Sequence, residues 1–177
     1  RAKRSLSSHY EYYLAEMEDN TRWRLEIIRQ LRQDFQAGSP QVWYQPQISL
    51  ATGEVIGIEA LLRWSNTNGF VQPPSVFIPL AEYSGLIVQI GAWVLDQACA
   101  QSGRLAELGF TSLKMVVNVS MPQFRKAGFV TEVARILAQH QMPPRWLELE
   151  ITESIAMDEP KVTLQSLETL RRFGVSI

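Results

Sequence analysis

The sequence contains very little cysteine and histidine, with one Cys and two His in 177 residues. A single cysteine excludes an intrachain disulfide, and a chain without disulfides is typical of a reducing, cytoplasmic compartment. Cys99 lies in the segment WVLDQACAQSG, whose spacing predicts the apolar side of a helix and therefore a buried structural thiol. Because zinc prefers His and Cys ligands, their scarcity argues against a zinc centre.

Long apolar runs and an excess of one charge are also missing. The chain has no run of about 18 or more apolar residues and no signal-peptide pattern. We therefore expect no membrane contact by these residues, although a longer parent protein can carry a membrane anchor. The 17 basic and 18 acidic side chains give a net charge of -1, so no overall field attracts nucleic acid polymers. What remains is a 46% hydrophobic chain that can form one substantial core.

The first segment, about residues 8 to 35, has the apolar spacing of a long amphipathic helix. The residues that recur at three or four positions are Leu14, Met17, Thr21, Leu25, Ile28, Leu31 and Phe35. Gly38, Ser39 and Pro40 predict the end of this helix and a linker, with a domain boundary after residue 41. Two interpretations stay open: a dimerising or signal-relaying coiled coil, and a helix that packs on the following domain.

Strand-like and helix-like segments alternate from residue 42 onward. Strands are predicted at 42–49, 54–64, 112–120, 145–152 and from 175, and helices at 73–85, 87–109, 127–140 and 160–174. This alternation predicts parallel βαβ units, and no GxGxxG or GxxxxGK[ST] motif follows a strand. The predicted fold is α/β, an incomplete TIM-like (β/α) barrel preceded by a long N-terminal helix. Because the chain lacks an initiator Met and stops on an apolar strand start, we expect a fragment of a longer protein.

Polar residues occur at or near the ends of three successive predicted strands. Glu59 follows VIGI, Asn118 interrupts MVVNVS, and Glu150 lies in LELEIT. In a parallel barrel, side chains at the carboxyl ends of the strands converge on one mouth. Carboxylate and amide oxygens suit hard cations such as Mg²⁺, Mn²⁺ or Ca²⁺. Spacing alone leaves two interpretations open: a cation site, or exposed strand-end acids with a turn-forming amide. His9 and His140 are expected to be solvated surface residues rather than ligands.

Two further polar residues each permit two interpretations. Arg63 can bind a phosphate, because a guanidinium fork matches phosphate oxygens, or it can pack on the indole of Trp64 next to it. Gln45 interrupts an apolar strand before Pro46. It can mark a ligand contact or simply an edge strand.

Four segments together resemble the successive motifs of one family. They are WYQPQISLATGEVIGIEALLRW (43–64), FIPLAEYSGLI (77–87), VVNVS (116–120) and LELEITES (147–154). Residues 42–177 thereby resemble the N-terminal portion of EAL domains, bacterial phosphodiesterases that open cyclic di-GMP to linear pGpG. The segment RAKRSLSSHYEYYLAEM resembles the closing helix of a GGDEF domain and the helix that joins it to an EAL domain. The resemblance thus implies that residues 1–41 are the helical tail of an upstream GGDEF-like domain.

The resemblance also implies a role for each matching residue. It implies metal ligands at Glu59, Asn118 and Glu150, catalytic residues at Glu59 and Glu153, and contacts to the dinucleotide at Gln45, Leu62 and Arg63. The implied cofactor is Mg²⁺ or Mn²⁺. The implied partners are cyclic di-GMP and upstream GGDEF and sensory domains of the parent chain.

The family's next motif, an Asp-Asp pair followed by Phe-Gly-Thr-Gly, does not occur before Ile177. We therefore expect the parent protein to be a phosphodiesterase and the isolated fragment to be inactive. The alternative is a non-catalytic cyclic di-GMP receptor, because many EAL domains have lost ligands and still bind the dinucleotide. The presence of Glu59, Asn118, Glu150 and Glu153 favours hydrolysis.

Overall fold

The computed structural model of the chain describes residues 15–65, 69, 71–151 and 160–177. In chain order its elements are α1 (Ala15–Gln36), β1 (Gln41–Ile48), β2 (Val55–Ser65), β3 (Val71–Gln72), α2 (Pro74–Tyr83), α3 (Ile87–Glu107), β4 (Lys114–Val119), α4 (Met121–Phe124), α5 (Phe129–Gln139), the 3₁₀ helix η2 (Pro144–Trp146), β5 (Leu147–Ile151) and α6 (Pro160–Phe173). The sequence predicted the long helices and strands. It missed the short elements β3, α4 and η2.

The sheet has the strand order β1-β2-β4-β5, with β3 paired to β2 at one end. β1 and β2 form an antiparallel hairpin, whereas β2 with β4 and β4 with β5 are parallel. Glu148 forms a parallel bridge with Ser176, so a further strand begins on the far side of β5. This arrangement confirms the predicted α/β fold, a partial TIM-like barrel. Among the described helices, none has the length and apolar character that crossing a membrane requires.

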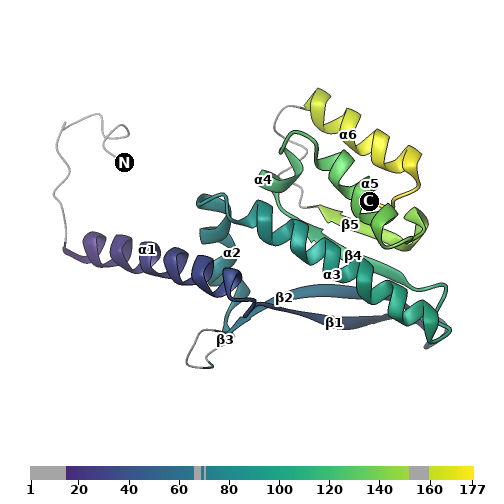
Figure 1. Cartoon of the computed structure of the whole chain (residues 1–177), viewed down its shortest axis with the longest axis horizontal. Helices are drawn as coiled ribbons and strands as arrows, with labels where there is room; N and C mark the ends of the chain where they lie inside the picture. Colours follow the sequence, from purple (N-terminus) through teal and green to yellow (C-terminus); the bar gives the residue numbers. More distant parts are fainter. Residues whose placement is uncertain (1–14, 66–68, 70, 152–159) are drawn as a thin grey trace.

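The helices cover one face of this sheet. In Figure 1, α3 runs along the strands, α5 and α6 lie beside β5, and α1 extends away at the N-terminal side. Because side chains alternate along a strand, β4 and β5 turn one set of apolar residues toward the helices. Those buried residues are Met115, Val117, Val119, Leu147 and Leu149. The opposite face carries Lys114, Asn118, Glu148 and Glu150 of the same strands, together with the buried Val116.

Among the described side chains of helix α1, those that join the core lie in its C-terminal turns. Ile27 and Leu31 are buried in the core, with Ile28 and Phe35 packed against it, while the Leu25 side chain is 60% exposed. The predicted stripe through Leu25 was therefore wrong, because the buried side of α1 runs through Ile27. Leu14 and Met17 fall among residues whose side chains are not described.

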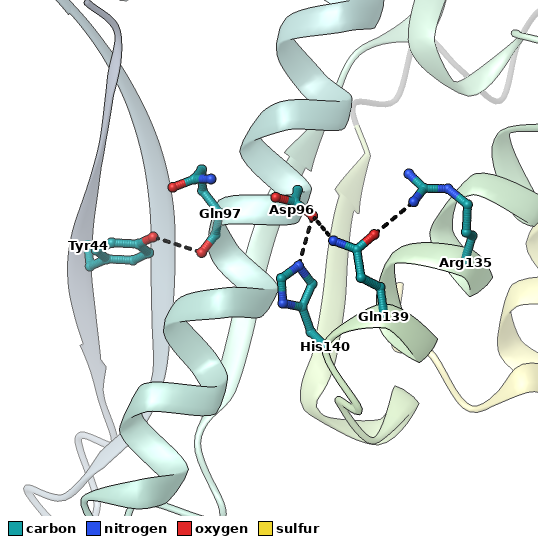
Figure 2. A network of polar contacts seen from close by, with 6 residues as sticks. All are labelled: Tyr44, Asp96, Gln97, Arg135, Gln139 and His140. Atoms are coloured by element: carbon teal, nitrogen blue, oxygen red, sulfur yellow. Dashed lines mark hydrogen bonds and ion pairs between the residues drawn. The ribbon is translucent and has the colours of Figure 1, made fainter. Parts of the chain in front are cut away.

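Helix α3 is joined to β1 on one side and to α5 on the other (Figure 2). The Tyr44 hydroxyl donates to the Gln97 carbonyl oxygen at 3.2 Å, and burial raises the pKa of Tyr44. On the α5 side, His140 Nε2 lies 2.8 Å from Asp96 Oδ1, which also accepts from Gln139 Nε2 at 3.2 Å. The expectation of a solvated His140 was wrong, since its side chain is only 19% exposed and joins two helices. His9 lies outside the described residues.

Gly91 in α3 lies directly against Gln123, a buried residue of α4. A Cβ atom added at Gly91 would lie 2.1 Å from Gln123 Oε1. We expect Gly91→Ala to lower the free energy of unfolding by about 1–3 kcal/mol, because the overfilled contact must shift a buried side chain. Hydrogen exchange of α3 amides in the full-length protein measures this loss.

Gly103 supplies the control for this prediction, because it lies in the same helix and an added Cβ there meets no atom within 4 Å. Gly103→Ala should leave α3 unchanged or stabilise it by about 0.5–1 kcal/mol through helix propensity. Equal effects of the two substitutions would contradict the steric explanation.

Cys99 is fully buried on the core side of α3, as the sequence predicted. Burial, followed by the nearby negative charge of Asp96, raises the pKa of the Cys99 thiol to about 12. At pH 8, well below this pKa, only about one thiol in 10⁴ is ionised, and the thiolate is the form that reacts. We expect iodoacetamide to leave Cys99 unmodified in the native protein at pH 8 and to label it after denaturation. Mass spectrometry of the Cys99 peptide checks this, and rapid native labelling would contradict the buried position.

Candidate functional site

Four polar side chains form a line across the uncovered face of the sheet. In the hairpin, Gln45 of β1 lies opposite Glu59 of β2. Asn118 of β4 is the register partner of Glu150 in β5. The Asn118 side chain joins these two pairs, because its Nδ2 donates a hydrogen bond to Glu59 Oε1 at 2.8 Å. Three strands thus bring Glu59, Asn118 and Glu150 to neighbouring positions on one face.

The local sequence explains why these side chains lie on the uncovered face. Ala60, Val117 and Leu149 each adjoin one of the polar residues and are buried toward the helices. Their burial turns the adjoining residue to the other side, because neighbouring side chains in a strand point to opposite faces. Asn118 lies within β4, so the interpretation of Asn118 as a turn-forming residue is wrong.

The second acid of β5 is already paired. Glu148 Oε2 lies 3.0 Å from Lys114 Nζ, and the same lysine contacts the Ser176 hydroxyl. Glu150, two residues further along the same face, is exposed and forms no ion pair or side-chain hydrogen bond within the described part of the chain. Of the two acids, Glu150 is therefore the one that remains available to a ligand.

The chemistry of this line fits a hard divalent cation. Glu59, Asn118 and Glu150 offer only oxygen atoms as ligands, as magnesium and manganese prefer. The Asn118 amide lies between the carboxylates of Glu59 and Glu150. Among the described residues, no group of three or more His, Cys, Asp and Glu side chains is arranged to hold a metal ion. A site made from these three residues alone would therefore leave coordination positions for water or a substrate. Glu153, the fourth acid implied by the resemblance, lies outside the described residues.

Arg63 lies on the same side of β2 as Glu59 and is partly buried. Its Nη1 donates to the Leu62 carbonyl oxygen at 3.0 Å, and its guanidinium carbon lies 5.6 Å from the centroid of the Trp43 ring. Arg63 does pack on an indole, but the indole comes from β1 rather than from the adjacent Trp64. Sequence neighbours could not reveal this contact, because it depends on the register of the hairpin.

Leu62 alternates with Arg63 along β2, so these two predicted contacts lie on opposite faces of the strand. It is partly buried and packs against the core, on the face that also buries Ala60 and Trp64. Leu61 alternates with it and therefore shares the face of Glu59 and Arg63. The signal for Leu61 was present in the sequence, because strand periodicity relates residues 59, 61 and 63.

A cavity of about 380 Å³ lies at this end of the sheet. Its walls include Arg63, Asn118 and Glu150, together with Leu61, Leu62 and apolar side chains of α2 and α3. Gln45 and Glu59 do not line this cavity. The polar line therefore borders the cavity on one side and continues over the open face of the hairpin on the other.

Comparisons with known proteins give a consistent result. The pattern of the EAL domain family matches residues 28–177. The bifunctional diguanylate cyclase/cyclic di-GMP phosphodiesterase MucR of Pseudomonas aeruginosa is 40% identical over 168 residues, covering 95% of this chain and 24% of MucR. The cyclic di-GMP phosphodiesterase NbdA of the same organism is 37% identical over 153 residues, covering 86% of this chain and 20% of NbdA.

One solved structure, the PaMucR phosphodiesterase in complex with c-di-GMP, superposes with a TM-score of 0.81 at 41% identity. The match covers 85% of this chain and 61% of that one. The chain therefore spans about a quarter or less of its curated relatives and under two thirds of this structure. The family match begins inside α1, ahead of residue 41, and the predicted domain boundary at that residue stays a prediction.

Proposed function

Because this chain belongs to the EAL domain family, we propose that the protein containing it hydrolyses cyclic di-GMP to linear pGpG with Mg²⁺ or Mn²⁺. One observation carries the proposal: Glu59 and Asn118 meet at 2.8 Å on the sheet face that also bears Glu150. The similarity to MucR and NbdA supports the substrate. The chain covers part of such proteins, so the activity is proposed for the whole polypeptide.

The residues of the polar line would hold the metal. A bound divalent ion supplies an activated water molecule and neutralises charge on the phosphoryl oxygens. The hydrogen bond from Asn118 Nδ2 fixes the orientation of the Glu59 carboxylate. It leaves the second Glu59 oxygen and the Asn118 amide oxygen as acceptors for the ion. Glu150 contributes a further carboxylate from the neighbouring strand. Glu153 stays in the proposal as a residue that steadies this site.

The dinucleotide would lie along the same face. Arg63 provides a cation that matches a phosphodiester oxygen pair. Gln45, opposite Glu59 in the hairpin, supplies an amide beside the metal ligands. The apolar contact at Leu62 stays in the proposal, because Leu62 lines the cavity beside Arg63, and we add Leu61, which lines the same cavity and shares the face of Glu59. Upstream, we propose that residues 1–41 are the tail and linker of a GGDEF-like domain in the cytoplasmic part of the parent protein.

The test is product analysis with the full-length protein. Incubation with cyclic di-GMP and Mg²⁺ or Mn²⁺ should yield pGpG as the first product, and EDTA should stop its formation. Binding of cyclic di-GMP without product would instead identify a receptor and overturn the hydrolytic function. Product formation that persists in EDTA would overturn the metal dependence.

A further inference from the structure

Trp43 places a large aromatic ring on the sheet face that bears Glu59. Its side chain is 55% exposed, and its register partner in β2 is Leu61. The neighbours of Trp43 in β1, Val42 and Tyr44, pack against the core on the opposite face. Strand alternation therefore places Trp43 with Gln45, which lies directly opposite Glu59.

Core packing does not explain an indole at this position. Burial of a Trp side chain would remove a large apolar area from water, and such burial stabilises a fold by several kcal/mol (about 25 cal/mol per Å²). Trp43 leaves about half of that area in solvent. Along its own face of β1 it is flanked by Gln41 and Gln45, both exposed and polar. The ring thus lies in polar surroundings beside the proposed metal ligands.

The ring is also held in one orientation. Trp43 Nε1 donates a hydrogen bond to Gln41 Oε1 at 3.2 Å. The guanidinium carbon of Arg63 lies 5.6 Å from the ring centroid. A fixed indole loses little conformational entropy when a planar ligand stacks on it. The adjoining guanidinium can donate to a phosphate oxygen, or to the O6 and N7 acceptors of a guanine.

We propose that Trp43 is a stacking platform for one guanine base of cyclic di-GMP. The inference rests on the proposed function, because that function supplies the ligand. Stacking of a base on an aromatic side chain contributes about 1–3 kcal/mol. Loss of the ring should therefore raise the KM for cyclic di-GMP about 5- to 150-fold. The kcat should change little, because Trp43 offers no group to the reacting phosphate.

The experiment compares three variants of the full-length protein by steady-state hydrolysis of cyclic di-GMP. Trp43→Ala should raise KM by the stated factor, and Trp43→Phe should recover most of the affinity because it keeps an aromatic face. Trp23→Ala is the matched control, since Trp23 of α1 is similarly exposed at 50% but lies outside the site. It should leave KM and kcat unchanged. If the wild type binds without turnover, the same comparison is made with Kd.

Other outcomes overturn the proposal. An unchanged KM in Trp43→Ala, with normal wild-type hydrolysis, would show that the ring does not contact the base, while the proposed function would stand. A lower unfolding free energy with unchanged KM would show that another part of the polypeptide covers Trp43. A wild type that neither binds nor hydrolyses cyclic di-GMP would remove the proposed function, and the inference with it.

Discussion

Replacing Glu59 with Gln should reduce metal-dependent production of pGpG by the full-length protein about 10³-fold. The amide keeps the size of the carboxylate and can still accept the hydrogen bond from Asn118 Nδ2. It removes the negative charge that the proposed divalent ion requires. Metal catalysis contributes several kcal/mol to such reactions, and a loss of about 4 kcal/mol corresponds to the stated factor. Rates of pGpG formation in saturating cyclic di-GMP measure the effect.

Glu54 provides a matched control for this prediction. It is an exposed glutamate just ahead of β2, on the turn of the same hairpin. Glu54→Gln changes the net charge by the same amount and should leave the rate unchanged. A second measurement, Mn²⁺ affinity by electron paramagnetic resonance, should fall in Glu59→Gln only. Unchanged turnover and Mn²⁺ affinity in Glu59→Gln would remove Glu59 from the site.

Replacing Asp34 with Ala should lower the free energy of unfolding by about 1.5–3 kcal/mol, as expected for the loss of a buried hydrogen bond to a charged group. Trp64 Nε1 donates to Asp34 Oδ2 at 2.8 Å, and both side chains are almost completely buried. The substitution leaves the indole N–H without its acceptor. Because this bond connects α1 to β2, urea unfolding and hydrogen exchange in β2 should both report the loss.

Related variants separate the hydrogen bond from packing at the same place. Asp34→Asn keeps an acceptor oxygen and should recover most of the stability. Trp64→Phe keeps an aromatic ring against Phe77, whose centroid lies 5.6 Å from the indole, but removes the donor. The double variant Asp34→Ala/Trp64→Phe should lose less unfolding free energy than the two single variants lose together. The difference should be about 1 kcal/mol or more. Strict additivity would show that the two side chains do not stabilise each other.

Much of the fold could be predicted from the sequence because its signals are local. Apolar residues recur every three or four positions within helices α3 and α5. The predicted helices 87–109 and 160–174 each end at a glycine. The βα alternation specified parallel strands, and the parallel pairs β2–β4 and β4–β5 confirm them. The buried Cys99 followed from its place on an apolar helix face.

The contacts between distant elements could not be predicted in the same way. The pairs Asp34 with Trp64 and Asp96 with His140 join residues 30 and 44 positions apart, so no sequence period relates them. The position of Trp43 under Arg63 depends on which residues of the hairpin lie opposite each other. Leu61 could be added from the sequence, because the period of a strand relates it to Glu59 and Arg63, and the contact at Leu62 stays a prediction.

The central claim is that Glu59, Asn118 and Glu150 together hold the divalent metal of a cyclic di-GMP phosphodiesterase. The most direct measurement is a crystal structure of the full-length protein with Mn²⁺ and cyclic di-GMP, with diffraction data collected at the manganese absorption edge. We predict an anomalous peak coordinated by oxygen atoms of all three residues. A manganese peak bound elsewhere, with none at these residues, would contradict the claim.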